Sequence, residues 1–255
     1  LGLHILSSLL AGLLVGLIFY DAPWDWAGMQ NRSGVIFFTL AFYSISGLSA
    51  LGIWSSERLL FLRERAAGDY CTSAYFFSKI LGDIIPMRLI PPVIYAAVMY
   101  KLGLHSTGEC FAWFMLCLLL VGIASAGICF MVGTVCRDNG VANLVSSLLL
   151  LFSLLFCGFL LNKDDEGSWT YVSVGSYLSY AFEAMMVNEF FGQYFLFDPK
   201  SYKSVKVPVP GTAVLEQLGL HHHNFHRDMA VLAGLTGGFL LAAYILLKFF
   251  VKERR

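Results

Sequence analysis

Long apolar runs separated by shorter polar stretches dominate the chain. Six runs stand out, and each has the roughly 17–25 residues that a membrane-spanning helix needs. They are Leu1–Tyr20, Val35–Ile53, Ile80–Tyr100, Phe111–Val135, Val141–Leu161 and Met229–Val251. Backbone groups inside a bilayer must be hydrogen-bonded within the chain, so helices are the expected form. The pattern predicts an all-α, polytopic membrane protein with six transmembrane helices.

The composition supports this class. Of 255 residues, 58% are hydrophobic and 13% are charged, whereas soluble domains carry about 25% charged residues. The net charge is zero, which indicates neither an acidic nor a basic partner, and we expect no nucleic-acid partner. The six cysteines form no CxxC pair and sit mostly in or beside apolar runs, so we expect thiols rather than a disulfide framework.

Basic residues are distributed unevenly between the predicted loops. If the chain starts in the cytoplasm, nine Lys and Arg residues fall in the inner loops and tail, and two fall in the short outer loops. The nine are Arg58, Arg63, Arg65, Lys79, Arg137, Lys248, Lys252, Arg254 and Arg255, and the two are Arg32 and Lys101. Basic residues favour the cytoplasmic side. The pattern therefore predicts a cytoplasmic loop over 54–79 and a large non-cytoplasmic loop over 162–228.

Two stretches between the spans are unusual. The segment Ser56–Tyr70, "SERLLFLRERAAGDY", contains six charged residues; it fits either a short amphipathic helix under the membrane or a solvated loop. The segment Ser168–Phe195 is aromatic and apolar in stripes. We expect a short helix, or a pair, that dips into the outer leaflet or caps the bundle, although a compact extracellular subdomain is compatible with the same pattern.

Asp83 and Arg88 lie near the start of the third span. Charges at membrane depth are costly and are candidates for function. The alternative is that Arg88 reaches to the interface and that Asp83 pairs with Lys79, one helical turn away. Three prolines, at 86, 91 and 92, predict a kinked or broken start to this span.

Motifs for catalysis are absent from the sequence. It has no GxxxxGK[ST], HExxH or GxSxG, so we expect no catalytic site and no bound ATP in this chain. The tract "HHHNFH" raises the possibility of a metal-dependent enzyme built on His221, His222, His223 and His226, but no nearby Cys or carboxylate completes a ligand set. We expect a polar loop there and no metal.

Several strings resemble the membrane domain of the G subfamily of ABC transporters, the pigment, sterol and multidrug exporters. "ERLLFLRERAAGDY" is similar to the subfamily's E-x-x-x-F-x-x-E-x-x-x-G-x-Y loop. "QNRSGVIFF", "SAYFFSKILGDIIPMRLIPPVIYAAVMYKLGL", "GFLLN" and "YAFEAMMVNEFFGQ" resemble, in order, its second helix, its third helix, the end of its fifth and its outer re-entrant region. The resemblance covers essentially the whole of 1–255.

The resemblance implies a half-transporter membrane domain of the type-2 ABC exporter kind, paired with a second half that is identical or different. An ATP-binding domain, using ATP and Mg, would be joined to it but lies outside this chain, which opens abruptly on a span. The charged loop would contact that domain and couple its movement to the spans. The coupling residues so implied are Glu57, Arg58, Phe61, Arg63, Glu64, Gly68 and Tyr70.

The same resemblance implies a substrate cavity between the second and fifth helices of both halves. By position its lining would be Phe38, Phe42, Ile45, Ser46, Leu144, Ser147, Leu151 and Leu154. Phe159 and Leu160 would form a gate at the outer exit. A mostly apolar slot suits lipophilic or sterol-like substrates, although Phe42 and Ile45 depart from the multidrug pattern. The alternative is a truncated, non-transporting scaffold that pairs with a full half-transporter and regulates it.

Overall fold

The computed structural model describes residues 2–20, 23–102, 107–136, 138–160, 173–197 and 207–250; the side chain of Asp83 is not among those described. The elements, in chain order, are α1 (Gly2–Ile18), α2 (Trp26–Ser46), α3 (Ser49–Ala67), α4 (Thr72–Lys79), the π-helix η1 (Ile80–Ile84), α5 (Ile85–Leu102), α6 (Gly108–Val135), α7 (Asn139–Leu155), α9 (Tyr177–Phe190), β1 (Tyr194–Phe197), β2 (Val207–Pro210), α10 (Gly211–Gln217), the 3₁₀ helix η2 (His222–Asn224) and α11 (Phe225–Phe250).

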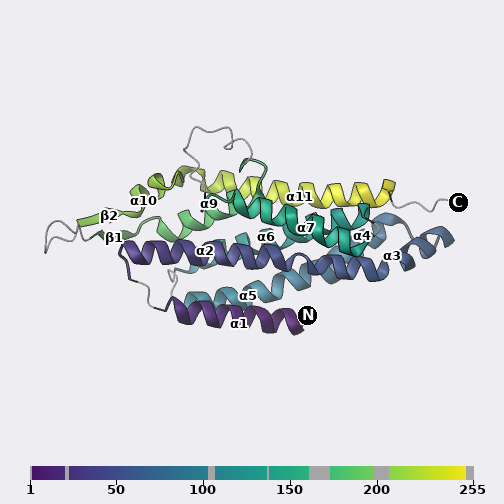
Figure 1. The fold of residues 1–255 in the computed structure, drawn as a ribbon, viewed down its shortest axis with the longest axis horizontal. Helices are drawn as coiled ribbons and strands as arrows, with labels where there is room; N and C mark the ends of the chain where they lie inside the picture. Colours follow the sequence, from purple (N-terminus) through teal and green to yellow (C-terminus); the bar gives the residue numbers. More distant parts are fainter. Residues whose placement is uncertain are drawn as a thin grey trace.

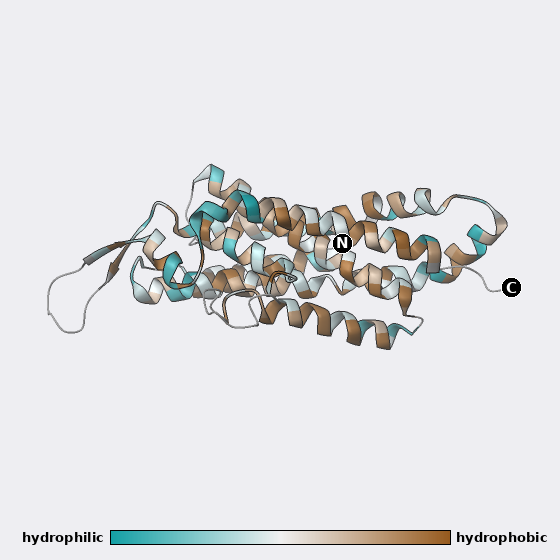
Figure 2. Ribbon diagram, turned by 90° about the horizontal axis from the view of Figure 1, so that it is seen from above, coloured by the Kyte–Doolittle hydropathy of each residue, from teal (hydrophilic) through white to brown (hydrophobic). Residues whose placement is uncertain are grey.

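The long helices lie side by side along one axis and form an elongated bundle (Figure 1). The connection between α3 and α4 lies at one end, which we call the α3 end, residues 57–79. The antiparallel pair of β1 and β2 lies at the other, which we call the hairpin end. Hydrophobic residues cover most of the length, and hydrophilic residues gather mainly toward the two ends (Figure 2). This distribution is the one that a bilayer around the middle of the bundle requires.

Six apolar helices occupy the positions of the six predicted runs. In the described part of the chain, four helical segments are long and apolar enough to cross a membrane: Trp26–Trp54, Thr72–Lys101, Gly108–Val135 and His222–Phe249. The other two, Gly2–Ile18 and Asn139–Leu155, are apolar but shorter. A mostly helical membrane bundle is thus confirmed, while six spans and the sides of the loops stay predictions.

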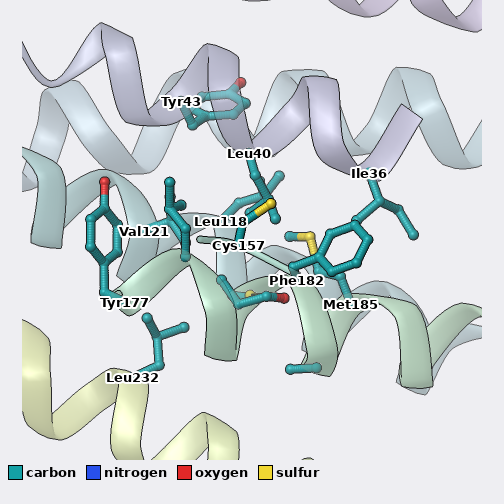
Figure 3. Packing of buried hydrophobic residues seen from close by; sticks show 14 of the residues in the cluster. Ile36, Leu40, Tyr43, Leu118, Val121, Cys157, Tyr177, Phe182, Met185 and Leu232 are labelled. Carbon is teal, nitrogen blue, oxygen red and sulfur yellow. The ribbon is translucent and has the colours of Figure 1, made fainter. Parts of the chain in front are cut away.

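The predicted outer loop contributes to the core of the bundle. α9 packs against α2, α6 and α11, and nearly all of its side chains are buried. Figure 3 shows Tyr177, Phe182 and Met185 of this helix between Leu40 of α2 and Leu232 of α11. The predicted short helix exists, but it is a central element of the bundle.

Three helix ends differ from the ends of the predicted apolar runs. α2 begins at Trp26, well before the predicted Val35, because Asp25 caps the helix by accepting a hydrogen bond from the Gly28 amide. α3 continues beyond the second span to Ala67 and ends at Gly68, whose φ of 86° suits glycine. α7 ends at Leu155, before the predicted end of the fifth span.

Two further features qualify the predicted architecture. The paired strands β1 and β2 show that the described chain is not purely α-helical. The third span begins with a π-helix, η1, directly before the proline-bearing α5. A single-turn π-helix is a known way to interrupt the regular ladder, so the predicted irregular start is present.

Candidate coupling and transport site

An aromatic cluster joins four helices at the α3 end. Its buried members are Trp54, Phe61, Phe76, Phe130, Ala243 and Leu247. The Trp54 indole N–H donates to the Gly133 carbonyl of α6 at 2.8 Å, and the ring centroids of Trp54 and Phe130 lie 5.0 Å apart. Because these contacts tie α3 to α4, α6 and α11, the α3 end is expected to move as one body.

Most charged groups of the predicted coupling loop bond within the chain. Glu57 accepts from Lys79 and, at 3.2 Å, from the Tyr75 hydroxyl. Arg58 donates to the Cys136 carbonyl just after α6. Arg65 donates to the Leu247 and Lys248 carbonyls near the end of α11, at 3.4 and 3.2 Å. Both arginines thus satisfy carbonyl groups at helix C-termini, where cations are favoured.

Tyr70 and Glu64 close the turn that follows α3. The Tyr70 hydroxyl donates to Glu64 Oε2 at 2.7 Å. Partial burial first, and then this hydrogen bond, raise the pKa of Tyr70 to about 12. Tyr70 therefore remains a protonated donor at neutral pH, and the turn at Gly68 keeps its geometry.

An exposed stripe remains on the outer surface of α3. Leu59 is 69% exposed and Leu60 is 55% exposed, and Arg63, Ala66 and Ala67 follow at helical spacing. Among the predicted coupling residues, Phe61 is buried in the aromatic cluster, whereas Arg63 lies on this stripe. Leu59 and Leu60 fit the amphipathic helix that the sequence allowed here, but the sequence reasoning did not place them among the coupling residues.

Arg88 fastens the junction between α2 and α3. It is 3% exposed. It donates to the Ser46 hydroxyl, the Ser46 carbonyl and the Ser49 hydroxyl, each at 2.8 Å. Arg88 is thus bonded within the bundle, and Lys79 pairs with Glu57. The predicted pair of Asp83 with Lys79 involves a side chain outside those that the structure describes. Because Ser46 accepts hydrogen bonds from Arg88, Ser46 is part of this junction as well as of the predicted cavity lining.

Gly47 at the same junction is expected to resist substitution. A Cβ there would meet Ser125 Oγ at 2.6 Å and Ser125 Cβ at 2.7 Å. Gly47→Ala should lower the melting temperature of the purified full-length protein, since overpacking costs about 1–3 kcal/mol. Ser125→Gly in the same background should recover part of the loss, while unchanged melting of Gly47→Ala would refute the close contact.

An exposed apolar face runs along α2 and α7, which pack against each other. Four predicted cavity residues lie on it: Phe38 and Ile45 of α2, and Leu144 and Leu151 of α7, each 47–64% exposed. The sequence reasoning missed other exposed α7 residues on or beside it, and the helical repeat from Leu144 was the signal. They are Leu148, Phe152 and Leu155.

The remaining predicted cavity residues are less accessible. Phe42 is partly buried and lies 6.3 Å from the Tyr95 ring of α5. Leu154 packs against the core. Ser147 is partly exposed, and its hydroxyl donates to the Leu144 carbonyl of its own helix at 2.9 Å. The face that the structure presents is therefore more apolar than the predicted lining.

The predicted gate lies at the turn after α7. Gly158 has a φ of 99°, a conformation that favours glycine. Phe159 stacks on Phe37 of α2 at 4.7 Å and meets the edge of Phe182 of α9 at 5.9 Å. Leu160 is 57% exposed. Phe159 is thus held by rings from two helices at one edge of the apolar face.

A buried ion pair connects α2 and α9 toward the hairpin end. Arg32 is 5% exposed and Glu189 is 3% exposed, and Arg32 Nη1 donates to Glu189 Oε1. The Arg32 guanidinium also lies 3.8 Å from the centroid of a Trp24 ring. No local sequence pattern indicates this pair, because its partners are far apart in the chain.

The histidine tract lies at the hairpin end, in and around η2. Among the described residues, no three His, Cys, Asp or Glu side chains are grouped to hold a metal ion. All six cysteines, which the structure describes, are reduced thiols. His222 and His226 of the tract instead line a cavity at the hairpin end.

Comparison with known proteins identifies the family to which the chain belongs. The ABC-2 type transporter family matches residues 2–190, most of the chain. The chain therefore belongs to the ABC-2 type transporter family.

Two of the relatives carry names of the G family. ABC transporter G family member 24 of Dictyostelium discoideum is 37% identical over 247 residues, 96% of this chain and 21% of that protein. The mouse broad substrate specificity ATP-binding cassette transporter ABCG2 is 36% identical over 194 residues, 75% of this chain and 30% of that protein. A probable ATP-dependent permease of Saccharomyces cerevisiae is 29% identical over 258 residues, 100% of this chain and 24% of that protein.

These matches confirm the resemblance to the G-subfamily membrane domain. The chain spans between a fifth and a third of the length of these relatives. It corresponds to a membrane part of such transporters, and the activity of a whole transporter is a separate question.

Proposed function

We propose that the chain is the membrane module of an ATP-driven G-type exporter that moves lipophilic or sterol-like molecules. The observation that carries the proposal is the exposed apolar face of α2 and α7, with Phe38, Ile45, Leu144 and Leu151 at its centre. A second half-transporter, identical or different, would cover this face and leave an apolar slot between the halves. Such a slot matches the chemistry of lipophilic ligands.

Conformational changes driven by ATP hydrolysis would be transmitted to the membrane module at the α3 end. The names of the relatives include ATP-binding cassette transporters, and a nucleotide-binding domain holding ATP and Mg would dock on the exposed stripe of Leu59, Leu60 and Arg63. The aromatic cluster makes the α3 end one body, and Arg88 clamps α3 to α2. Movement of the stripe would therefore reach Ile45 and Phe38 on the apolar face as a rigid-body shift.

The proposed topology follows from the positions of the basic residues. Arg58, Arg63, Arg65 and Lys79 gather at the α3 end, and Lys248 lies near the end of α11. Because basic residues favour the cytoplasmic side, the α3 end would be cytoplasmic and the hairpin end would face the other side. The module would be multi-pass, in the plasma membrane or an internal membrane.

Filling the apolar face tests this function. Leu151→Trp should reduce ATP-dependent transport of lipophilic compounds by the full-length protein. The larger side chain would overpack the slot at a cost of about 1–3 kcal/mol. This cost corresponds to roughly a 5- to 150-fold loss of affinity for the substrate. Transport is measured in sealed proteoliposomes with a panel of lipophilic and sterol-like fluorescent compounds.

The matched control is Leu6→Trp in α1. Leu6 is 51% exposed and Leu151 is 52% exposed, so the two changes differ in place but not in size or accessibility. Transport by Leu6→Trp should remain at the wild-type level. Equal transport by the wild type and Leu151→Trp would contradict the assignment of the face to substrate.

A further inference from the structure

A cavity lies at the hairpin end, away from the α2 and α7 face. Its volume is about 300 Å³, and it lies between the start of α6, the end of α9 and the start of α11. Sites for small molecules range from about 300 to 1,000 Å³. A cavity at the lower limit fits a small group, such as a lipid headgroup, rather than a drug-sized molecule.

Aromatic rings make up most of the wall. Trp113 of α6 lies 5.3 Å from Phe225 and 5.9 Å from His226, measured between ring centroids. On the side of α9, Phe191 stacks on His222 at 5.8 Å. Trp113 is 36% exposed and Phe191 is 58% exposed, so rings from three segments border the cavity and remain accessible. Aromatic faces of this kind attract cations, and several together recognise quaternary ammonium groups.

The charged group that lines the cavity is negative and therefore favours a cation. Glu109 contributes a carboxylate, and no Lys or Arg occurs among the described residues that line the cavity. Arg227, which follows His226, donates to the buried Asp228 at 3.0 Å and is not a lining residue. An anion would meet the Glu109 carboxylate, whereas a cation would be attracted to it.

Hydrogen bonds between the surrounding segments hold the walls of the cavity. Glu183 of α9 accepts from the His221 amide at 3.2 Å and from the Asn224 side chain at 3.4 Å, which fixes η2 against α9. The Asn188 side chain donates to the Cys110 carbonyl at 2.9 Å, which fixes α9 against α6. The site is thus formed before any ligand arrives, which lowers the entropic cost of binding.

The place of the cavity suits a membrane component. Trp113 lies near the start of Gly108–Val135, and Phe225 lies near the start of His222–Phe249, two segments with the length and composition of membrane spans. The ends of two neighbouring spans meet at the level of the lipid headgroups, where tryptophan is enriched. A headgroup could enter there without leaving the bilayer.

We propose that this cavity binds a quaternary ammonium group, carried either by the headgroup of a choline lipid or by a free organic cation. Trp113, Phe225 and Phe191 provide the aromatic faces, and Glu109 provides the counter-charge. The proposal does not depend on the transport function, because the α2 and α7 face takes no part in it.

Binding is tested on the full-length protein, purified in a maltoside detergent that carries no choline group. Calorimetric titrations compare choline and tetramethylammonium with 3,3-dimethyl-1-butanol, a neutral compound of nearly the same shape as choline. A parallel arm reconstitutes the protein in nanodiscs of mixed phosphatidylcholine and phosphatidylglycerol and counts retained lipids by native mass spectrometry. The first arm detects a free cation and the second detects a lipid headgroup.

Three variants locate the site. Trp113→Leu should weaken binding by about tenfold, the size of a partly desolvated cation–π contact, and Glu109→Gln should weaken it severalfold. Trp26→Leu removes another exposed tryptophan and should leave binding unchanged. Glu109→Gln changes an exposed side chain, so it also reports on binding if Trp113→Leu fails to fold.

The possible results distinguish a free cation from a lipid headgroup, and both from failure of the proposal. Binding of choline or tetramethylammonium that depends on Trp113 and Glu109 supports the proposal with a free cation as ligand. Selective retention of phosphatidylcholine with the same dependence supports it with a lipid as ligand. Binding of the neutral compound as tightly as choline, loss of binding in Trp26→Leu to the same extent, or no preference for choline compounds in either arm would overturn it.

Discussion

Glu189→Gln is expected to destabilise the protein by about 3–5 kcal/mol, because it leaves the buried Arg32 charge without its counter-charge. Arg32 and Glu189 are 5% and 3% exposed, so water cannot replace the lost carboxylate. The pair joins α2 to α9, and Trp24 on the other side of the guanidinium joins it to the strand β1 through the contact of Trp24 with Phe195. The loss should appear as a lower melting temperature of the full-length protein in detergent.

A double variant separates the buried charge from the packing. Arg32→Met with Glu189→Leu removes both charges and keeps comparable apolar volume, so it should recover much of the stability that Glu189→Gln loses. Glu216 of α10 is exposed, and Glu216→Gln serves as the matched control with little expected effect. If Glu189→Gln and Glu216→Gln melt alike, the ion pair does not stabilise the bundle.

Leu60→Glu is expected to separate ATP hydrolysis from transport. Leu60 is 55% exposed on the stripe that we propose as the docking surface of the nucleotide-binding domain. A carboxylate in the centre of an apolar contact must be desolvated, and loss of about 1.4 kcal/mol there corresponds to a tenfold effect. Transport should fall by about tenfold while basal ATP hydrolysis continues, when both are measured in the same proteoliposomes.

The control carries the same substitution at the opposite end. Leu196 of β1 is 43% exposed at the hairpin end, and Leu196→Glu should leave coupling intact. Arg63→Ala should act in the same direction as Leu60→Glu, since Arg63 lies on the stripe. Full coupling in Leu60→Glu would show that the nucleotide-binding domain docks elsewhere.

Local patterns explain why part of this structure could be predicted from the sequence. The apolar runs located all six apolar helices, since length and hydropathy are properties of a contiguous segment. The start of α2 could have been read from Asp25 before a helical run, which is an N-cap signal, but the apolar run alone put the start at Val35. The β1–β2 pair was not, since β2 is "VPVP" and proline disfavours strands.

Long-range partners explain the rest. The sequence marks Arg88 as a costly charge at membrane depth, but its acceptors Ser46 and Ser49 belong to two other helices, α2 and α3, so the contacts depend on packing. Arg58 and Arg65 resembled free loop charges, yet the structure turns them to carbonyl groups at the ends of α6 and α11. The apolar face was partly anticipated, because Leu144 and Leu151 share a helical repeat, whereas the partial burial of Phe42 depends on the neighbouring α5.

The measurement that tests the central claim most directly is accumulation of a lipophilic or sterol-like fluorescent compound in sealed proteoliposomes of the full-length protein. ATP is compared with a non-hydrolysable analogue, and ATP hydrolysis is followed in the same vesicles. The account predicts accumulation that requires ATP hydrolysis. Steady hydrolysis without accumulation of any compound in a broad panel would contradict it and would favour the regulatory scaffold instead.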